Sequence, residues 1–240
     1  MEVYQILTLA LVQGLTEFIP VSSSAHLTLI PALTGWCNQG LGMNVAFHIG
    51  TMIAIIVYFW DDVKSMLIGT LRLTIGQIDY GGTLIAILLL ATPPALIAGY
   101  LIDQYAQEFI YDLSLIGWAL IGFGILLYLC DKMGLTIRKF EHLTIGHALI
   151  IGFAQAFAFL PGVSRLGITI SMARLLNYER TEAAKFSFLL SIPIIMASGI
   201  YKGLQFYRAQ NFEILEYAVY GIIFSFIAGL MTISLMMQWM

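Results

Sequence analysis

Six long stretches without a charged side chain constrain this sequence more than any other feature. They cover residues 18–60, 81–102, 113–130, 143–164, 186–201 and 217–240. A helix needs roughly 20 apolar residues to cross the hydrocarbon core of a bilayer. Charged residues make up only 10% of the chain, whereas a soluble domain usually carries about 25%. The chain is therefore predicted to be an all-α, polytopic integral membrane protein that forms a single transmembrane domain over residues 1–240.

The positions of the basic residues predict the orientation of the chain. Lys64 and Arg72 flank a polar connection at 61–80, and three more basic residues lie in the connection at 131–142, whereas the connection at 103–112 is acidic. Because lysine and arginine concentrate in cytoplasmic loops, the first two connections are expected in the cytoplasm and the third outside. The helices predicted around these connections cover 44–60, 83–102 and 113–130.

Two segments are interrupted by a proline and fit poorly as simple membrane spans. They cover residues 3–36, broken at IPVSSSA, and residues 143–176, broken at LPGVSRLG. Proline ends the preceding helix and is well placed at the start of a new one. Backbone groups that are freed at membrane depth must be buried in protein or line a polar cavity. Both segments are therefore predicted to be re-entrant helical hairpins.

The two hairpins are also predicted to be copies of each other. One constant shift along the sequence superimposes three pairs of residues: Pro20 and Pro161, Ser23 and Ser164, Phe47 and Phe188. Each copy then consists of a hairpin followed by two spans, with repeat one at about 1–102 and repeat two at about 143–240. Because the helix at 113–130 separates the copies, the second starts on the opposite side of the membrane. Such inverted-topology repeats usually place their site where broken helices meet.

The first break, EFIPVSSSAHL, holds a carboxylate, three hydroxyls and an imidazole in an otherwise apolar chain. Ser22 or Ser23 is expected to cap the helix that follows the proline, and the N–H groups at such a helix end bind anions. Glu17 lies one turn after Gln13, and His26 lies on the same side of the new turn as Ser23. Hydroxyl, imidazole and carboxylate are the parts of an activated nucleophile or a general acid–base pair.

The second break, LPGVSRLGIT, offers the same kind of helix end, with Ser164 at its start and Arg165 beside it. Two positive helix ends and a guanidinium group are therefore expected to meet in one cavity near the middle of the membrane. Arginine holds phosphate oxygens through two parallel hydrogen bonds. The ligand predicted for this cavity is a phosphate group.

Each candidate also has a purely structural interpretation. Glu17 and Arg165 are then an ion pair, His26 is a satisfied core histidine, and the serines, Ser24 included, only cap a helix. A carboxylate deep in an apolar helix is a functional hypothesis by default, which favours a role in the site for Glu17. For His48, in FHIGT, the sequence favours a packed histidine over a group that supports the site.

Two long motifs make the sequence resemble a known family. GLTEFIPVSSSAH and LPGVSRLGITIS resemble, in this order, the two signature motifs of the undecaprenyl-diphosphate phosphatase family, the bacitracin-resistance membrane phosphatases. RTEAAKFSFLLSIPII resembles the segment that follows the second motif, so the resemblance covers nearly the whole chain. It implies an inner-membrane enzyme with an inverted repeat. Such an enzyme removes the terminal phosphate of undecaprenyl diphosphate and recycles the carrier lipid for cell-wall synthesis.

The resemblance also implies roles for individual residues. Glu17 matches the second glutamate of the first motif, Ser23 its proposed nucleophile, and His26 its histidine. Ser164, Arg165 and Thr169 match phosphate-binding residues of the second motif. The catalytic residues expected are Glu17, Ser23, His26 and Arg165, and the substrate-binding residues expected are Ser22, Ser24, Ser164, Arg165, Thr169 and Gln13.

Three positions depart from the family pattern. Gln13 stands where the family has its first glutamate, Ala25 where it has a glycine, and Leu166 where it has a second serine. The change at Gln13 removes a candidate metal ligand or base. It weighs against dependence on a divalent cation, Mg²⁺ or Ca²⁺, for which Glu17 is the remaining candidate ligand.

The sequence thus predicts a phosphatase acting on a polyprenyl diphosphate in the bacterial inner membrane, with a site open to the extracytoplasmic side. Membrane lipids and a second copy of the chain in a homodimer are the other expected partners. A net charge of −3 without a basic cluster argues against nucleic acid. The alternative is a transporter or flippase, because such proteins commonly contain inverted repeats with broken helices. The clustered hydroxyl, imidazole and carboxylate favour the enzyme, since transport needs no nucleophile.

Overall fold

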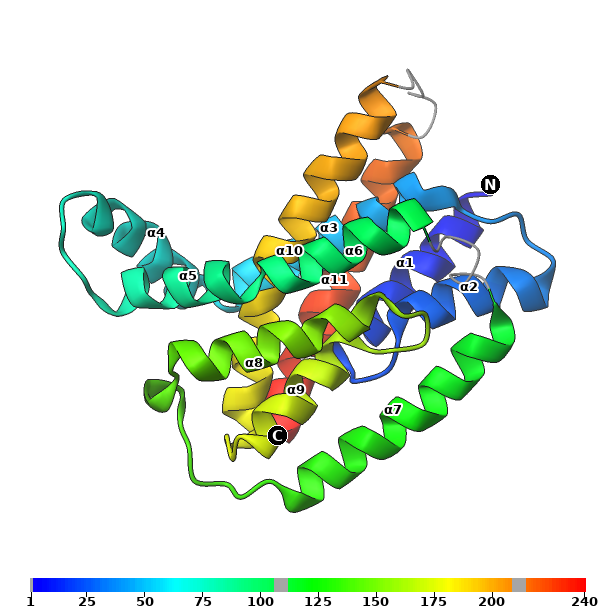
Figure 1. Cartoon of the computed structure of the whole chain (residues 1–240). Coiled ribbons are helices and arrows are strands. Elements are labelled where there is room, and N and C mark those ends of the chain that lie inside the picture. Colours follow the sequence, from blue (N-terminus) through cyan, green and yellow to red (C-terminus); the bar gives the residue numbers. More distant parts are fainter. Residues whose placement is uncertain (1, 106–111, 209–214) are drawn as a thin grey trace.

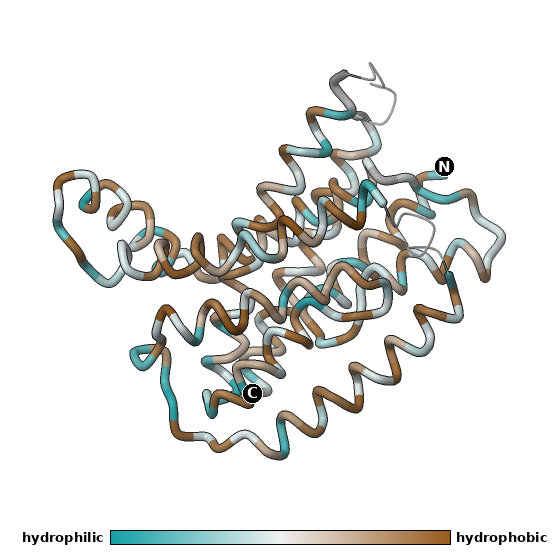
Figure 2. The backbone as a smooth tube through the Cα atoms, viewed as in Figure 1, coloured by the Kyte–Doolittle hydropathy of each residue, from teal (hydrophilic) through white to brown (hydrophobic). Residues whose placement is uncertain are grey.

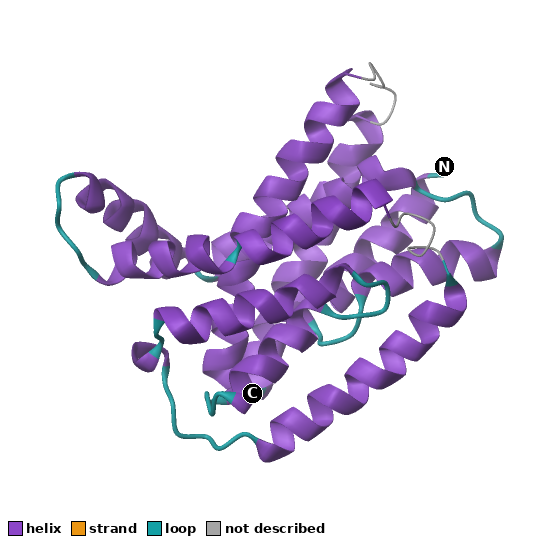
Figure 3. Ribbon diagram, in the orientation of Figure 1, coloured by secondary structure: helices purple, strands orange, loops and turns teal. Residues whose placement is uncertain are grey.

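The computed structural model describes residues 2–105, 112–208 and 215–240, and almost all of them lie in helices (Figures 1 and 3). The α-helices are α1 (Val3–Phe18), α2 (Ser23–Thr34), α3 (Gly40–Tyr58), α4 (Trp60–Thr74), α5 (Tyr80–Ala91), α6 (Pro93–Tyr105), α7 (Leu113–Met133), α8 (Ile145–Gln155), α9 (Arg165–Leu175), α10 (Arg180–Arg208) and α11 (Leu215–Trp239). Two short 3₁₀ helices, η2 (Phe140–His142) and η3 (Ala156–Phe159), flank α8. The described residues form no strand, so the all-α prediction is confirmed.

Four helical segments are long and apolar enough to cross a membrane. They are Tyr80–Tyr105, which joins α5 and α6, Leu113–Met133, Arg180–Gln205 and Tyr217–Trp239. A fifth span results if α3 and α4, which are bent by 88° at Phe59, count as one. Figure 2 shows hydrophobic residues along α7. Only 11% of the most apolar stretch of this helix is buried in the protein, as expected for a helix that faces lipid. The prediction of a multi-pass membrane protein is confirmed.

The connection predicted at 61–80 is mostly helical, which corrects the sequence interpretation. Residues 60–74 form α4, and α4 packs alongside α5 as a helical hairpin, seen at the left of Figure 1. Charged side chains made this stretch look like a loop. Asp61 and Asp62 lie in the first turn of α4 and Arg72 in the last, where each charge favours a helix through its dipole.

Each segment predicted to be a re-entrant hairpin forms a pair of packed helices. α1 and α2 are separated by residues 19–22, and α8 with η3 is separated from α9 by residues 160–164. The second break depends on Gly162, whose φ of 91° favours glycine and which lies so close to α7 that a Cβ would collide with the carbonyl oxygen of Ile116. The position of either hairpin within a membrane remains a prediction.

The helices of the two predicted copies pack in a reciprocal pattern. α1, which opens the first copy, packs against α11, the last span of the second. α8, which opens the second copy, packs against α5 and α6, the last span of the first. α3 and α10 follow the two hairpins and pack against each other. The inverted-topology repeat stays a prediction, and this exchange of partners is what two interlocked copies would produce.

Candidate functional site

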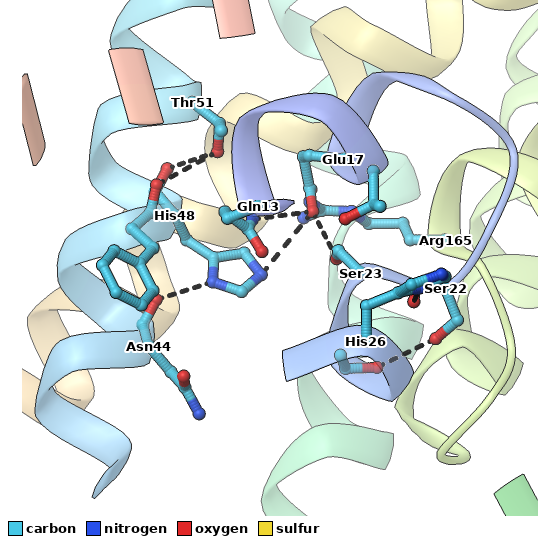
Figure 4. Close-up of polar contacts among 12 residues, drawn as sticks. Gln13, Glu17, Ser22, Ser23, His26, Asn44, His48, Thr51 and Arg165 are labelled. Carbon is cyan, nitrogen blue, oxygen red and sulfur yellow. Dashed lines mark hydrogen bonds and ion pairs between the residues drawn. The ribbon is translucent and has the colours of Figure 1, made fainter. Parts of the chain in front are cut away.

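The two breaks lie against each other at the centre of the candidate site (Figure 4). A Cβ on Gly167, in the first turn of α9, would lie 3.5 Å from the carbonyl oxygen of Pro20. Arg165 at the start of α9 forms an ion pair with Glu17 near the end of α1, across 148 residues of sequence. The structure therefore joins the two motifs that the sequence singles out.

Serines cap both of the helices that begin at the breaks. The Oγ atom of Ser22 accepts a hydrogen bond from the Ala25 N–H at 3.3 Å, and that of Ser164 accepts one from the Gly167 N–H at 3.1 Å. The sequence shift pairs Ser164 with Ser23, but the residue that caps α2 is Ser22. The two caps differ by one position because the second break is one residue longer than the first. Since Ser22 caps α2, the hydroxyl of Ser23 is free for another partner.

Glu17 collects the polar contacts of the site. Its Oε2 atom accepts hydrogen bonds from Ser23 Oγ at 2.7 Å and from Gln13 Nε2 at 3.0 Å, while Oε1 binds the guanidinium of Arg165. Only 8% of the Glu17 side chain is exposed. A carboxylate that is removed from water needs such donors and an opposite charge. Here the neutral donors come from α1 and α2, and the charge comes from α9. The structure thus brings Gln13, Glu17, Ser23 and Arg165 together.

His48 joins the site although the sequence favours a packed role for it. Its Nε2 atom lies 3.7 Å from Glu17 Oε2, and its side chain is 29% exposed. Its Nδ1 atom lies 2.7 Å from the carbonyl oxygen of Asn44, so Nδ1 carries the proton and Nε2 faces the carboxylate. An imidazole within the uncharged run at 18–60 was the available signal, and the sequence could not show which way it points.

Two further candidates lie on α2 but do not contact Glu17 through a hydrogen bond. His26 Nδ1 lies 2.8 Å from the carbonyl oxygen of Ser22, and the exposed Ser24 places its Oγ atom 3.0 Å from Ser22 Oγ. Within the described part of the chain no hydrogen bond joins His26 to Ser23. The carboxylate of Glu17, and not the imidazole three residues further along α2, is therefore the partner of the Ser23 hydroxyl.

Thr169 and Gln13 are both completely buried. The Thr169 hydroxyl donates to the carbonyl oxygens of Arg165 and Leu166, at 2.9 and 3.1 Å, within its own helix. The Oε1 atom of Gln13 has no hydrogen-bond partner among the described residues. Substrate binding by Thr169 and Gln13 stays a prediction, and only Gln13 keeps an unused polar atom for it.

The residues of the site offer few ligands to a metal ion. No three His, Cys, Asp or Glu residues come together in the part of the chain that the structure describes. Mg²⁺ and Ca²⁺ prefer several oxygen ligands, and the carboxylate of Glu17 already binds Arg165. Gln13 Oε1 is the unused oxygen beside it. A divalent cation at this place would have to take most of its ligands from a phosphate group.

The fold and the site together define a class: a multi-pass helical membrane protein with a serine, a carboxylate and an arginine gathered where two broken helices meet. Comparison with known sequences is more specific. The chain belongs to the family described as bacitracin resistance protein BacA, which matches residues 6–240. The family resemblance seen in the two motifs is therefore confirmed.

Similar relatives carry the name undecaprenyl-diphosphatase. The protein of Roseobacter denitrificans is 41% identical over 240 residues, which cover 99% of this chain and 90% of the relative. That of Dinoroseobacter shibae is 42% identical over 240 residues, with the same coverage of both chains. That of Saccharophagus degradans is 42% identical over 229 residues, which cover 95% of this chain and 86% of the relative.

Proposed function

We propose that this protein is a membrane phosphatase that hydrolyses undecaprenyl diphosphate, or a related polyprenyl diphosphate, to the monophosphate and phosphate. The family and the names of the relatives support this activity. The observation that carries it is the 2.7 Å hydrogen bond from Ser23 Oγ to Glu17, because the same carboxylate also binds Arg165. The nucleophile Ser23, its base Glu17 and the phosphate-binding guanidinium of Arg165 thus lie together. The reaction recycles the carrier lipid for cell-wall synthesis.

In the substrate complex the diphosphate lies against the N-termini of α2 and α9, where free N–H groups and the helix dipoles favour an anion. Arg165 turns from Glu17 to the phosphate oxygens and holds them with its planar pair of donors. The lipid tail leaves sideways between helices. Arg165 also stabilises the charge that spreads over the phosphoryl oxygens during transfer. Ser164 contributes by capping α9 and so fixing the helix end that receives the phosphate.

The reaction uses Glu17 as a base and an acid in turn. Glu17 takes the proton of Ser23 as Oγ bonds to the terminal phosphorus, and the bond from that phosphorus to the bridging oxygen breaks. Glu17 passes the proton to the departing lipid monophosphate. Water then attacks the phosphoserine, its proton returns through Glu17 to Oγ, and phosphate leaves.

A divalent cation, Mg²⁺ or Ca²⁺, is proposed to enter with the diphosphate. Glu17 and the Oε1 atom of Gln13 would be its protein ligands, and the phosphate oxygens would supply the others. When bound, the ion would neutralise negative charge on the phosphate oxygens. The small number of protein ligands is consistent with an ion carried by the substrate.

The site is proposed to open to the extracytoplasmic side of the bacterial inner membrane. The support is the distribution of basic residues, which favours a cytoplasmic position for 61–80 and 131–142 and an external one for 103–112. Residues 106–111 of the last connection lie outside the described residues. Association as a homodimer stays a prediction.

The activity is tested with purified, monodisperse protein in detergent. Phosphate should be released from undecaprenyl diphosphate without a second compartment, which separates hydrolysis from transport. Protein that binds the lipid diphosphate but releases no phosphate would contradict the proposal and favour a transporter or flippase. Neither the family nor the names of the relatives support that alternative. Trapping of labelled phosphate on Ser23 after an acid quench separates attack by the serine from direct attack by water.

A further inference from the structure

A small cavity lies between α10 and the Glu17–Arg165 ion pair. Its polar lining consists of Glu17, Arg165, Ser187 and Ser191, and apolar side chains complete it. Its volume of about 10 Å³ is room for one water molecule. Ser23 does not line this cavity, which lies on the α10 side of the ion pair.

Ser187 lines this cavity with a buried hydroxyl that has no hydrogen-bond partner among the described residues. Its side chain is only 3% exposed. Other buried serines donate to a carbonyl oxygen of their own helix, as Ser191 does to Phe188 at 2.6 Å and Ser225 to Gly221 at 2.7 Å. A buried hydroxyl without a partner is costly, so Ser187 points to a partner that occupies the cavity.

We propose that Ser187 and Ser191 hold one water molecule against the Glu17–Arg165 pair. The two serines lie four residues apart on α10 and so share one face of that helix. The water accepts a hydrogen bond from Ser187, donates one to the carboxylate of Glu17 and donates the other to Ser191 Oγ, whose own proton binds Phe188. Three such bonds are typical of a buried water molecule, and they satisfy the Ser187 hydroxyl.

This water makes Ser187 and Ser191 positioning residues for the reaction, an inference that rests on the proposed function. When Arg165 turns to the phosphate, Glu17 Oε1 loses its charged donor. The water on the α10 side replaces that donor and keeps the other carboxylate oxygen, Oε2, directed at Ser23. Removal of the water should therefore lower kcat, which depends on this alignment, and leave KM nearly unchanged.

The kinetic test compares Ser187→Ala with two other variants. Ser187→Ala should lower kcat roughly tenfold or more, the range found when a group that orients an active-site residue is lost. Ser187→Thr keeps the hydroxyl and should retain most of kcat. Ser225→Ala removes an equally buried helical hydroxyl from α11 and should leave kcat and KM as in the wild type. Wild-type kcat in Ser187→Ala would overturn the positioning role.

The structural test is independent of activity. A crystal structure of the wild-type protein that resolves ordered water should show one molecule within hydrogen-bond distance of Ser187 Oγ and of the Glu17 carboxylate. The same water should be absent from Ser187→Ala. A dry cavity in the wild type would overturn the inference even if the enzyme is active, whereas a bound water in a protein without phosphatase activity would leave the water site standing and overturn the proposed function.

Discussion

Ser23 and Arg165 occupy equivalent positions, because each is the first helical residue after a capping serine. At such a position a side chain does not have to satisfy the helix end, since the cap already does so. Both side chains are therefore available to bind Glu17, one as a neutral donor and one as a cation. This equivalence explains how two motifs with different residues build one site.

Replacement of Ser23 by alanine should separate binding from chemistry. Ser23→Ala removes the hydroxyl but leaves the helix N-terminus and Arg165 in place. Turnover should fall by at least about a thousandfold, while the lipid diphosphate still binds. Phosphate release and direct binding to folded protein measure the two effects. Thr28→Ala, which removes a hydroxyl that donates to the Ser24 carbonyl one turn further along α2, is the control and should stay active. Near-normal turnover of Ser23→Ala would rule out the serine as nucleophile.

Replacement of Gln13 by glutamate tests the proposed cation. Gln13 Nε2 lies 3.0 Å from Glu17 Oε2, so Gln13→Glu puts a second carboxylate beside the first. The two negative charges should attract Mg²⁺ or Ca²⁺ and lower the cation concentration needed for half-maximal activity, by about tenfold. Titration of each ion into chelator-treated protein measures this. Gln13→Asn keeps an uncharged amide and serves as the control. Identical titration curves for wild type and Gln13→Glu would show that no cation binds here.

At the scale of helices, close backbone contacts decide where the elements lie. In the α4–α5 hairpin a Cβ on Gly81 would collide with the carbonyl oxygen of Ser65, and a Cβ on Gly69 would collide with the backbone of Gly82. The hairpin therefore depends on the absence of side chains at these places. Asp79 caps α5 through the Gly82 N–H at 2.8 Å, and this hydrogen bond lowers the pKa of its carboxyl group.

A methyl group at Gly81 should force α4 and α5 apart. Gly81→Ala is expected to destabilise the protein by about 1–3 kcal/mol and to lower Tm by several degrees, because the backbone of α4 must move. Gly117→Ala is the matched control, since a Cβ at Gly117, in α7, meets nothing within 4 Å. Thermal unfolding of both variants in the same detergent measures the difference. An unchanged Tm for Gly81→Ala would show that the two helices separate without cost.

At the scale of the whole molecule, the site exists because helices from both ends of the chain exchange partners. α1 packs against α11 while α8 packs against α5 and α6, and this brings the two breaks face to face (Figure 1). The buried rings of Phe18 and Phe188, with centroids 5.6 Å apart, hold the end of α1 against α10. Glu17 is consequently held at the break, beside the first turn of α9.

Cysteine labelling tests the orientation of the molecule. In a background without native thiols, Cys37→Ser with Cys130→Ala, single cysteines replace Glu108 and Lys139. A membrane-impermeant thiol reagent applied to intact spheroplasts should label the first and spare the second, because basic connections stay in the cytoplasm. Labelling after permeabilisation shows that both thiols are reactive. The reverse pattern would place the mouth of the first hairpin in the cytoplasm.

Local properties of the sequence were sufficient to predict the membrane class, the two proline breaks and the principal candidates Glu17, Ser23 and Arg165. Hydropathy and the missing N–H of proline act within a few residues, so they can be recognised without a structure. The same locality explains the failure at 61–80, where charges typical of a loop are also typical of helix ends. The sequence thus identified Glu17, Ser23 and Arg165 as candidates, but not the contacts between them or the place of His48.

Tertiary packing alone decided how those residues are used. It assigned the cap of α2 to Ser22 and left the Ser23 hydroxyl to Glu17, it turned His48 toward the carboxylate, and it put Ser187 beside a cavity. Neither hydropathy nor the spacing of residues along the chain predicts any of these contacts. They depend on which helix faces another and at what register, and only the packing of side chains in the assembled fold determines that.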